Sequence, residues 1–229
     1  MKRILFVVNN DREFDCSELL VKYLDGWETE IATELPATPS DYQLIILWNY
    51  RKIIKNIPEP NNVIIFHSSD LPEGRGWAPI HYTITEQKEF YVICGIMAAP
   101  EVDCGDIVVK ARFRILPNHT ATILRRFDNE ITIMAIRKIL ERFKGSPLKG
   151  APQRGQATYR SRRSKEDNIF DVNRPFYELI SHFRACEPSA PAAFHYRGEM
   201  YSVTVSPMSA PSFPRDVEFI FPEDELAHL

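Results

Sequence analysis

The run Ile4-Leu5-Phe6-Val7-Val8 decides the fold class, because it is a continuous stretch of β-prone apolar residues. A continuous apolar run, unlike an alternating one, is typical of a strand that is buried on both faces of a parallel sheet. Runs of the same kind recur at residues 43–48 and 62–66, and a helical pattern at residues 16–24 precedes a shorter strand at residues 30–33. This order predicts an α/β sheet with crossover connections.

The second half of the chain adds strands, one long helix and a change in composition. The spacing of apolar residues predicts strands at residues 91–96 and 107–115, helices at 120–143 and 176–186, and short strands at 201–205 and 217–221. Asp128-Asn129 is a point at which the long helix could be interrupted. Residues 144–165 are rich in Gly, Pro, Lys and Arg, which predicts a connector over the surface.

Together these elements predict a Rossmann-type, mainly parallel sheet with a small α+β appendage at the carboxyl end. We expect the large α/β unit over residues 1–145, the connector over 146–170 and the appendage over 171–229. A chain of 229 residues is long enough to bury one large core.

Composition narrows the classes of function. The chain carries 28 Lys and Arg against 31 Asp and Glu, so a basic footprint for nucleic acid over the whole surface is not expected. Its apolar runs are too short for a membrane span, and no signal peptide is recognisable. The four cysteines are scattered, without the spacing of a zinc site or a disulfide framework. We therefore expect a cytoplasmic protein without a metal, a membrane or a nucleic-acid partner.

Two loops carry residues suited to acid–base chemistry. His67 follows a buried strand, and ligands of open α/β sheets bind at the carboxyl ends of strands. A histidine there can polarise a carbonyl or exchange a proton, although it could also simply cap a turn. Asp103 lies in a second loop beside a strand, where its carboxylate could orient His67 or form part of an ordinary turn.

Several segments together resemble the formyltransferases that use N10-formyltetrahydrofolate. The resemblance runs in consistent order from about residue 2 to residue 194. It rests on His67 with Leu71-Pro72 and Arg75-Gly76-Trp77-Ala78-Pro79, on Asp103-Cys104-Gly105-Asp106-Ile107-Val108, on Gln153-Arg154-Gly155-Gln156-Ala157-Thr158-Tyr159, on Lys165-Glu166-Asp167-Asn168-Ile169-Phe170-Asp171 and on Arg184-Ala185. It implies a formyltransferase-like fold and acyl transfer to a primary amine, with N10-formyltetrahydrofolate as the formyl donor.

The resemblance also implies roles for individual residues. His67 would donate to the oxyanion of the tetrahedral intermediate, and Asp103 would receive the proton of the amine. The family's asparagine two positions before the histidine is replaced by Ile65, which cannot donate a hydrogen bond. Either Ser68, Ser69 or a backbone N–H supplies the missing bond, or the enzyme is slow, or the scaffold only binds folate. We select Ser69 as the third catalytic residue.

Binding residues follow from the same resemblance. The pterin of the cofactor is expected near Trp48, Asn49, Tyr50, Arg51, Ile53, Ile96, Met97 and Ala98. Trp48 and Ile53 could instead belong only to the core. Asn10, Arg75 and Gly76 are expected to contact the substrate.

A nucleotide-linked amino sugar fits best as the acceptor. The stretch after Asp171 is shorter than the tRNA-binding domain of methionyl-tRNA formyltransferases, and the glycine-rich phosphate turn of glycinamide-ribonucleotide enzymes is missing at residues 8–11. The basic residues of the segment 144–165 could meet a diphosphate or could be a solvated connector. The alternatives are another small amine of secondary metabolism, or a folate-binding relative without turnover. A homodimer is the expected assembly.

Overall fold

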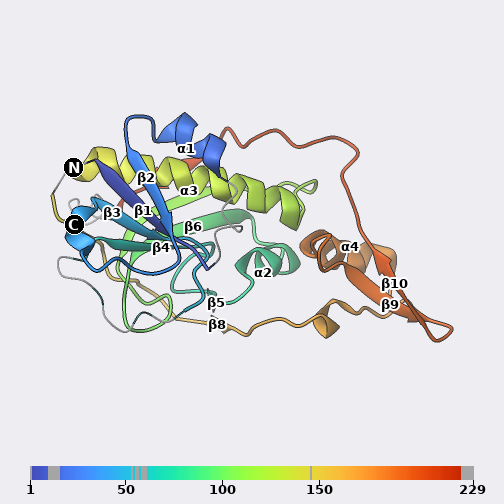
Figure 1. Ribbon diagram of the computed structural model, residues 1–229. Coiled ribbons are helices and arrows are strands. Elements are labelled where there is room, and N and C mark those ends of the chain that lie inside the picture. The colour runs from blue at the N-terminus through green and yellow to red at the C-terminus, as the bar shows by residue number, and fades with distance from the viewer. Residues whose placement is uncertain are drawn as a thin grey trace.

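The computed structural model describes residues 2–9, 16–52, 54, 57, 61–144 and 146–222. Its centre is a seven-stranded sheet in the order β11-β7-β6-β4-β3-β1-β2 (Figure 1). The strands are β1 (Arg3–Val7), β2 (Glu28–Ala32), β3 (Leu44–Leu47), β4 (Val63–His67), β6 (Phe90–Met97), β7 (Ile107–Arg114) and β11 (Glu218–Ile220).

Most strands of this sheet run in one direction. β1 pairs in parallel with β2 and β3, and β3 pairs in parallel with β4. β6 is antiparallel to both β4 and β7, and β11 is antiparallel to β7. Consequently β1 to β4 and β7 share one direction, while β6 and β11 oppose it. The mainly parallel α/β sheet predicted from the apolar runs is confirmed, and the four residues of β3 are all buried, as a doubly covered strand requires.

Helices α1 (Ser17–Tyr23) and α3 (Ala121–Phe143) cover one face of the sheet (Figure 1). The expected interruption of α3 at Asp128-Asn129 is wrong, because the helix is continuous through both residues. Phe127 and Ile131 are buried on either side of this point and hold the helix against the sheet. The carboxylate of Asp128 accepts bonds from distant hydroxyls instead of competing for its own backbone.

Part of the connector forms a small two-stranded sheet, which is separate from the seven-stranded one. Strand β8 (Tyr159–Arg160) pairs in parallel with β5 (Arg75–Gly76), just before helix α2 (Pro79–Thr85). Gly76 has φ +98°, and a Cβ there would lie 2.6 Å from the carbonyl oxygen of Arg160. Only glycine fits this close approach of two backbones.

Replacing Gly76 with alanine is expected to lower the free energy of unfolding by about 1–3 kcal/mol, because it adds both backbone strain and a clash with β8. Gly26 is a matched control, since its φ is +81° but a Cβ there would meet nothing within 4 Å. Gly26→Ala should cost only the strain of the left-handed backbone, about 1 kcal/mol. Urea unfolding of both variants measures the difference, and equal losses would contradict the proposed role of the clash.

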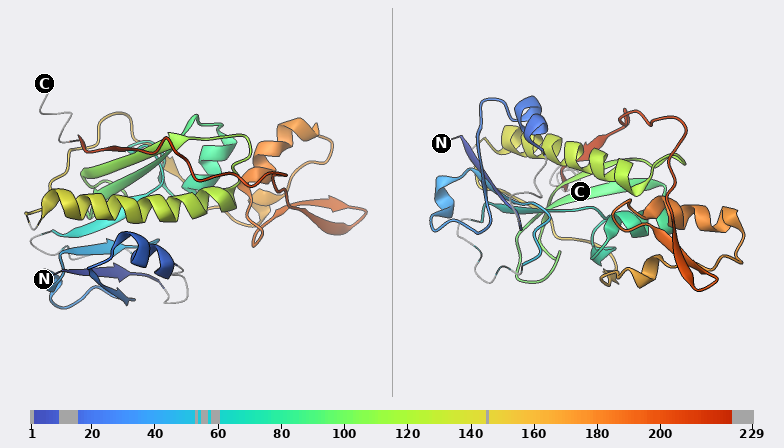
Figure 2. Two further views of the ribbon diagram at one scale, coloured as in Figure 1. Left: turned by 90° about the horizontal axis from the view of Figure 1, so that it is seen from above. Right: turned by 45° about the vertical axis from the view of Figure 1, so that its right-hand side comes forward.

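The appendage consists of helix α4 (Phe176–Ala185) and a hairpin of β9 (Ala192–Tyr196) and β10 (Glu199–Val203). The predicted helix at residues 176–186 is therefore present. The hairpin projects from the end of the molecule far from the amino terminus (Figure 2). The chain then returns to the large sheet as β11, so the predicted division at residues 146 and 171 stays a prediction. Within the described residues, no helix is both long and apolar enough to span a bilayer.

Candidate active site

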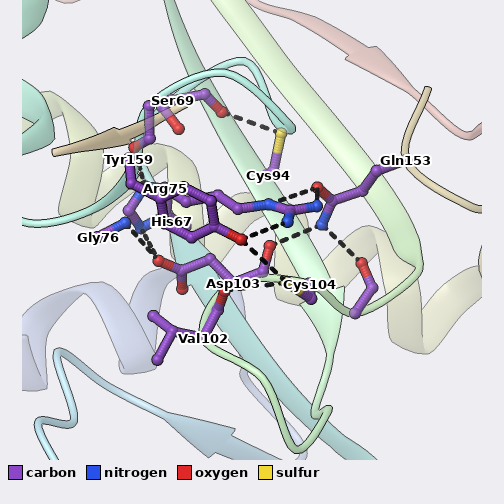
Figure 3. Close-up of polar contacts among 12 residues, drawn as sticks. His67, Ser69, Arg75, Gly76, Cys94, Val102, Asp103, Cys104, Gln153 and Tyr159 are labelled. Carbon is purple, nitrogen blue, oxygen red and sulfur yellow. Dashed lines mark hydrogen bonds and ion pairs between the residues drawn. The ribbon is translucent and has the colours of Figure 1, made fainter. Parts of the chain in front are cut away.

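His67 is the last residue of β4 and is buried beneath two loops. Its Nε2 lies 2.8 Å from the carbonyl oxygen of Gly74, and its Nδ1 lies 3.4 Å from Oδ2 of Asp103 (Figure 3). A carbonyl oxygen can only accept, so Nε2 carries the proton and donates it to Gly74. The carboxylate of Asp103 faces the other nitrogen, so groups from two loops hold the two ring nitrogens of His67.

Asp103 is held in place from both its side chain and its backbone. The Gly76 N–H donates to Oδ2 of Asp103 over 2.8 Å. The side-chain amide of Gln153 donates to the carbonyl oxygens of Asp103 and Gly105, at 2.8 and 2.9 Å (Figure 3). Asp103 itself has φ +53°, an uncommon conformation for a residue other than glycine. The carboxylate is thus fixed toward His67 before any ligand binds.

Arg75 belongs to the same network. Its Nε and Nη2 donate to Oε1 of Gln153, and its Nη1 donates to the hydroxyl of Tyr159 at 2.9 Å. Both partners are neutral, and among the described residues Arg75 forms no ion pair. The structure therefore places the predicted substrate residues Arg75 and Gly76 directly beside Asp103, with the charge of Arg75 available to an anion.

The hydroxyls of the two serines after His67 differ in their surroundings. Ser68 Oγ donates to Oδ2 of Asp128 over 2.5 Å. Ser69 Oγ is buried and has no hydrogen-bond partner among the described residues. It lies beside Gly74, because a Cβ on that glycine would be 3.4 Å from it. Ile65 is half-buried among apolar neighbours, so Ser69 remains the predicted donor in place of the missing asparagine.

A cavity of about 460 Å³ opens beside these loops. Asn49 and Ser68 line one part of it, and Arg163 and Lys165 of the connector line another. Burial, together with the charge of Arg163, lowers the pKa of His81 in the same wall to about 4, so His81 is neutral at pH 7. The cations of this wall are therefore arginines and lysine.

The predicted cofactor residues lie on both sides of β4, since β3 and β6 are its neighbours in the sheet. Asn49 lines the cavity, and the side chain of Asn9 fixes this loop by donating to the Asn49 carbonyl and accepting the N–H of Arg51. Trp48 is buried against Phe6, which agrees with a core role.

The other predicted binding residues contribute less to the cavity. Ile96 and Ala98 are buried in apolar clusters, while Tyr50 and Met97 are half-buried. The remaining two predicted contacts, Asn10 and Ile53, lie outside the described residues.

Two residues of the site received no role from the sequence. Gln153 was part of the family resemblance, but nothing in the sequence shows that its amide spans Arg75 and Asp103. Asp128 could have been found from the helical spacing of the sequence. It lies four residues after Leu124 and three before Ile131, which places it on the same face of α3 as these two buried residues. A carboxylate at such a position requires partners or a function.

Comparison with known proteins shows which proteins this chain resembles. No family model matches the chain. A methionyl-tRNA formyltransferase of Francisella philomiragia is 29% identical over 137 residues, which are 60% of this chain and 43% of that protein. The chain thus spans less than half the length of this curated relative.

Solved structures match over more of the chain. A methionyl-tRNA formyltransferase from Clostridium thermocellum has a TM-score of 0.69 at 19% identity and covers 96% of this chain and 100% of that one. HypX from Aquifex aeolicus in complex with tetrahydrofolic acid has a TM-score of 0.72 at 18% identity, covering 89% and 37% of the two chains.

An N-formyltransferase from Helicobacter canadensis, in complex with folinic acid and dTDP-3-aminofucose, has a TM-score of 0.65 at 14% identity and covers 86% of this chain and 85% of that one. At these identities the solved structures show the fold. Together with the curated relative, they confirm the predicted resemblance to the formyltransferase family, and the chain has the formyltransferase fold.

Proposed function

We propose that this chain, which has the formyltransferase fold, transfers a formyl group from N10-formyltetrahydrofolate to the primary amine of a nucleotide-linked amino sugar. The observation that carries the proposal is the buried His67–Asp103 pair at the carboxyl end of β4. Both side chains are largely shielded from solvent, with exposed fractions of 8% and 11%. Structural relatives with tetrahydrofolic acid or folinic acid support the choice of cofactor.

The residues of the pair divide the chemistry of acyl transfer. A neutral amine attacks the formyl carbon, a carbon–nitrogen bond forms, and the bond from that carbon to N10 breaks. His67 donates to the developing oxyanion, for which its Nε2 exchanges the Gly74 carbonyl for the formyl oxygen. Asp103 accepts the proton that the amine loses and passes it to N10, so tetrahydrofolate leaves with a protonated N10 and the carboxylate is restored.

The segments around β4 could hold the pterin of the cofactor. Residues 48–51 and 96–98 flank this strand, and the Asn9 side chain already fixes the backbone of the first segment. Backbone polar groups beside apolar side chains are the surroundings that a flat, polar-edged ring needs. Asn49, which also lines the cavity, would then lie between the cofactor and the acceptor.

The charges of the cavity favour an acceptor that carries an anion. Arg163 and Lys165 of the connector line the cavity. Arg75 is not among the lining residues, but it lies beside the His67–Asp103 pair and has neutral partners only. A diphosphate would complement these cations. A structural relative bound to dTDP-3-aminofucose supports this class of acceptor, whereas another small amine would use the cations less fully.

Incubation of the protein with N10-formyltetrahydrofolate and a panel of amino-sugar nucleotides, including dTDP-3-aminofucose, tests the proposal. Mass spectrometry should detect the gain of one formyl group on a panel member, and methionyl-tRNA should stay unmodified. Tetrahydrofolate binding without formylation of any amine would contradict the proposal. It would support the alternative of a folate-binding relative without turnover, which is motivated by Ile65 in place of the family's asparagine. The homodimer and the cytoplasmic location stay predictions.

A further inference from the structure

Asp128 is a carboxylate on the buried face of α3, held only by hydroxyl groups. Its Oδ2 accepts hydrogen bonds from Ser68 Oγ at 2.5 Å and from the hydroxyl of Tyr91 at 2.6 Å. Its Oδ1 has one long contact, 3.5 Å from Oγ1 of Thr132. Among the described residues no Lys or Arg forms an ion pair with Asp128, so one of its two oxygens is poorly satisfied.

A carboxylate in such surroundings is costly for the folded protein. Burial raises the pKa of Asp128, and the two hydroxyl bonds only partly oppose this effect. Asp128 is half-buried and lines the cavity. Its Oδ2 is well bonded, whereas Oδ1 has only the long contact with Thr132 and can still accept a hydrogen bond. A ligand with a hydrogen-bond donor would complete the set.

The cavity of about 460 Å³ gives such a ligand access to Asp128. Asp128 lines it together with Ser68, the residue directly after His67. The other acidic residue described in this wall, Glu187, is already paired with Arg125 at 2.5 Å. Asp128 is therefore the lining carboxylate that remains for a ligand, and it is bonded to Ser68, the residue directly after His67.

We infer that Asp128 determines acceptor specificity by accepting a hydrogen bond from a hydroxyl group of the acceptor that enters this cavity. The inference rests on the proposed function, because it takes the cavity to be the acceptor site. It assigns two carboxylates two tasks. Asp103, beside His67, takes the proton of the reacting amine, and Asp128 recognises a donor group of the acceptor. The cations Arg163 and Lys165 would contact the acceptor's anion.

Calorimetric titration of dTDP-3-aminofucose into the full chain tests the inference, with folinic acid present so that binding is measured without turnover. Asp128→Asn keeps an oxygen that can accept from Ser68 and Tyr91, but it removes the charge. We expect the dissociation constant for dTDP-3-aminofucose to rise about 10-fold or more, and that for folinic acid to change less than twofold. If Asp128→Asn does not fold, Asp128→Glu, which displaces the carboxylate, should also weaken acceptor binding.

Two matched variants separate recognition from a structural role. Glu130→Gln removes a carboxylate from the same helix, where it pairs with Lys22 outside the cavity, and should leave acceptor binding within twofold. Tyr91→Phe removes a hydrogen bond to Asp128 from a buried residue that does not line the cavity. Tyr91→Phe should weaken acceptor binding less than threefold. If Asp128 had only a structural role, Tyr91→Phe would weaken acceptor binding as much as Asp128→Asn does.

dTDP-fucose, which carries a hydroxyl in place of the amine, identifies the donor group. If Asp128→Asn weakens both nucleotides equally, a sugar hydroxyl is the group recognised; if it weakens only the aminated one, Asp128 contacts the reacting amine and the division of tasks between Asp103 and Asp128 is wrong. The inference is overturned if wild-type protein binds neither nucleotide, if Asp128→Asn binds both as well as wild type, or if Tyr91→Phe loses as much as Asp128→Asn. A failure of formyl transfer alone would overturn the proposed function and leave Asp128-dependent binding intact.

Discussion

Asp103→Asn is expected to lower kcat for formyl transfer by about 10³-fold or more while leaving folinic acid binding within a few fold. In the proposed reaction the carboxylate takes up the proton of the amine, a task that arises only as the reaction proceeds. An asparagine oxygen can still accept the Gly76 N–H, so the loop should keep its position. Single-turnover formylation of the acceptor identified by mass spectrometry measures the loss.

Two further variants define how specific this effect is. Glu101→Gln removes an exposed charge from the same loop and should keep kcat within twofold. His67→Asn should lose less activity than Asp103→Asn, because a shorter amide still reaches part of the way to the oxyanion. If Asp103→Asn retains a tenth of the wild-type kcat, with folding and folinic acid binding unchanged, Asp103 is not the group that accepts the proton of the amine.

The sheet was predictable because its signal is local. Continuous apolar runs at β1, β3 and β4 predict strands that are buried on both faces, and they occupy the centre of the sheet. The antiparallel placement of β6 and β11 was not predictable in this way, because pairing direction depends on which strands become neighbours. The last strand, β11, has only three residues and is defined by its pairing with β7.

The candidate site also has features that follow from local sequence and features that depend on contacts between distant segments. The place of His67 at a strand end follows from local sequence, and its pairing with Asp103 could be anticipated from two loops at one edge of a sheet. The contact from Gln153 to Asp103 spans a separation of 50 residues and requires β8 to dock on β5. Asp128 is a different case, because the helical periodicity of α3 identifies it in the sequence as a polar residue on an apolar face.

If the Ser69 hydroxyl takes the place of the asparagine amide that Ile65 cannot provide, Ser69→Ala is expected to lower kcat by about 10²-fold. Ser69 Oγ is buried, is unpartnered among the described residues, and lies beside Gly74, whose carbonyl holds His67 Nε2. Ser68→Ala should cost less than 10-fold, since the Ser68 hydroxyl already donates to Asp128. Single-turnover rates, with thermal unfolding as a check of folding, measure both variants.

A donor role and a structural role for Ser69 differ in the effect of a second substitution. Placing Asn at position 65 in the Ser69→Ala variant returns an amide two residues before His67, on the strand that ends at the proposed oxyanion site. We expect Ile65→Asn to raise kcat of that variant at least 10-fold, although it costs stability by burying an amide among apolar neighbours. A hydroxyl that only supports the loop could not be replaced by an amide on β4. Absence of this rescue, with the double variant folded and binding folinic acid, would therefore show that the oxyanion depends on His67 and backbone donors alone.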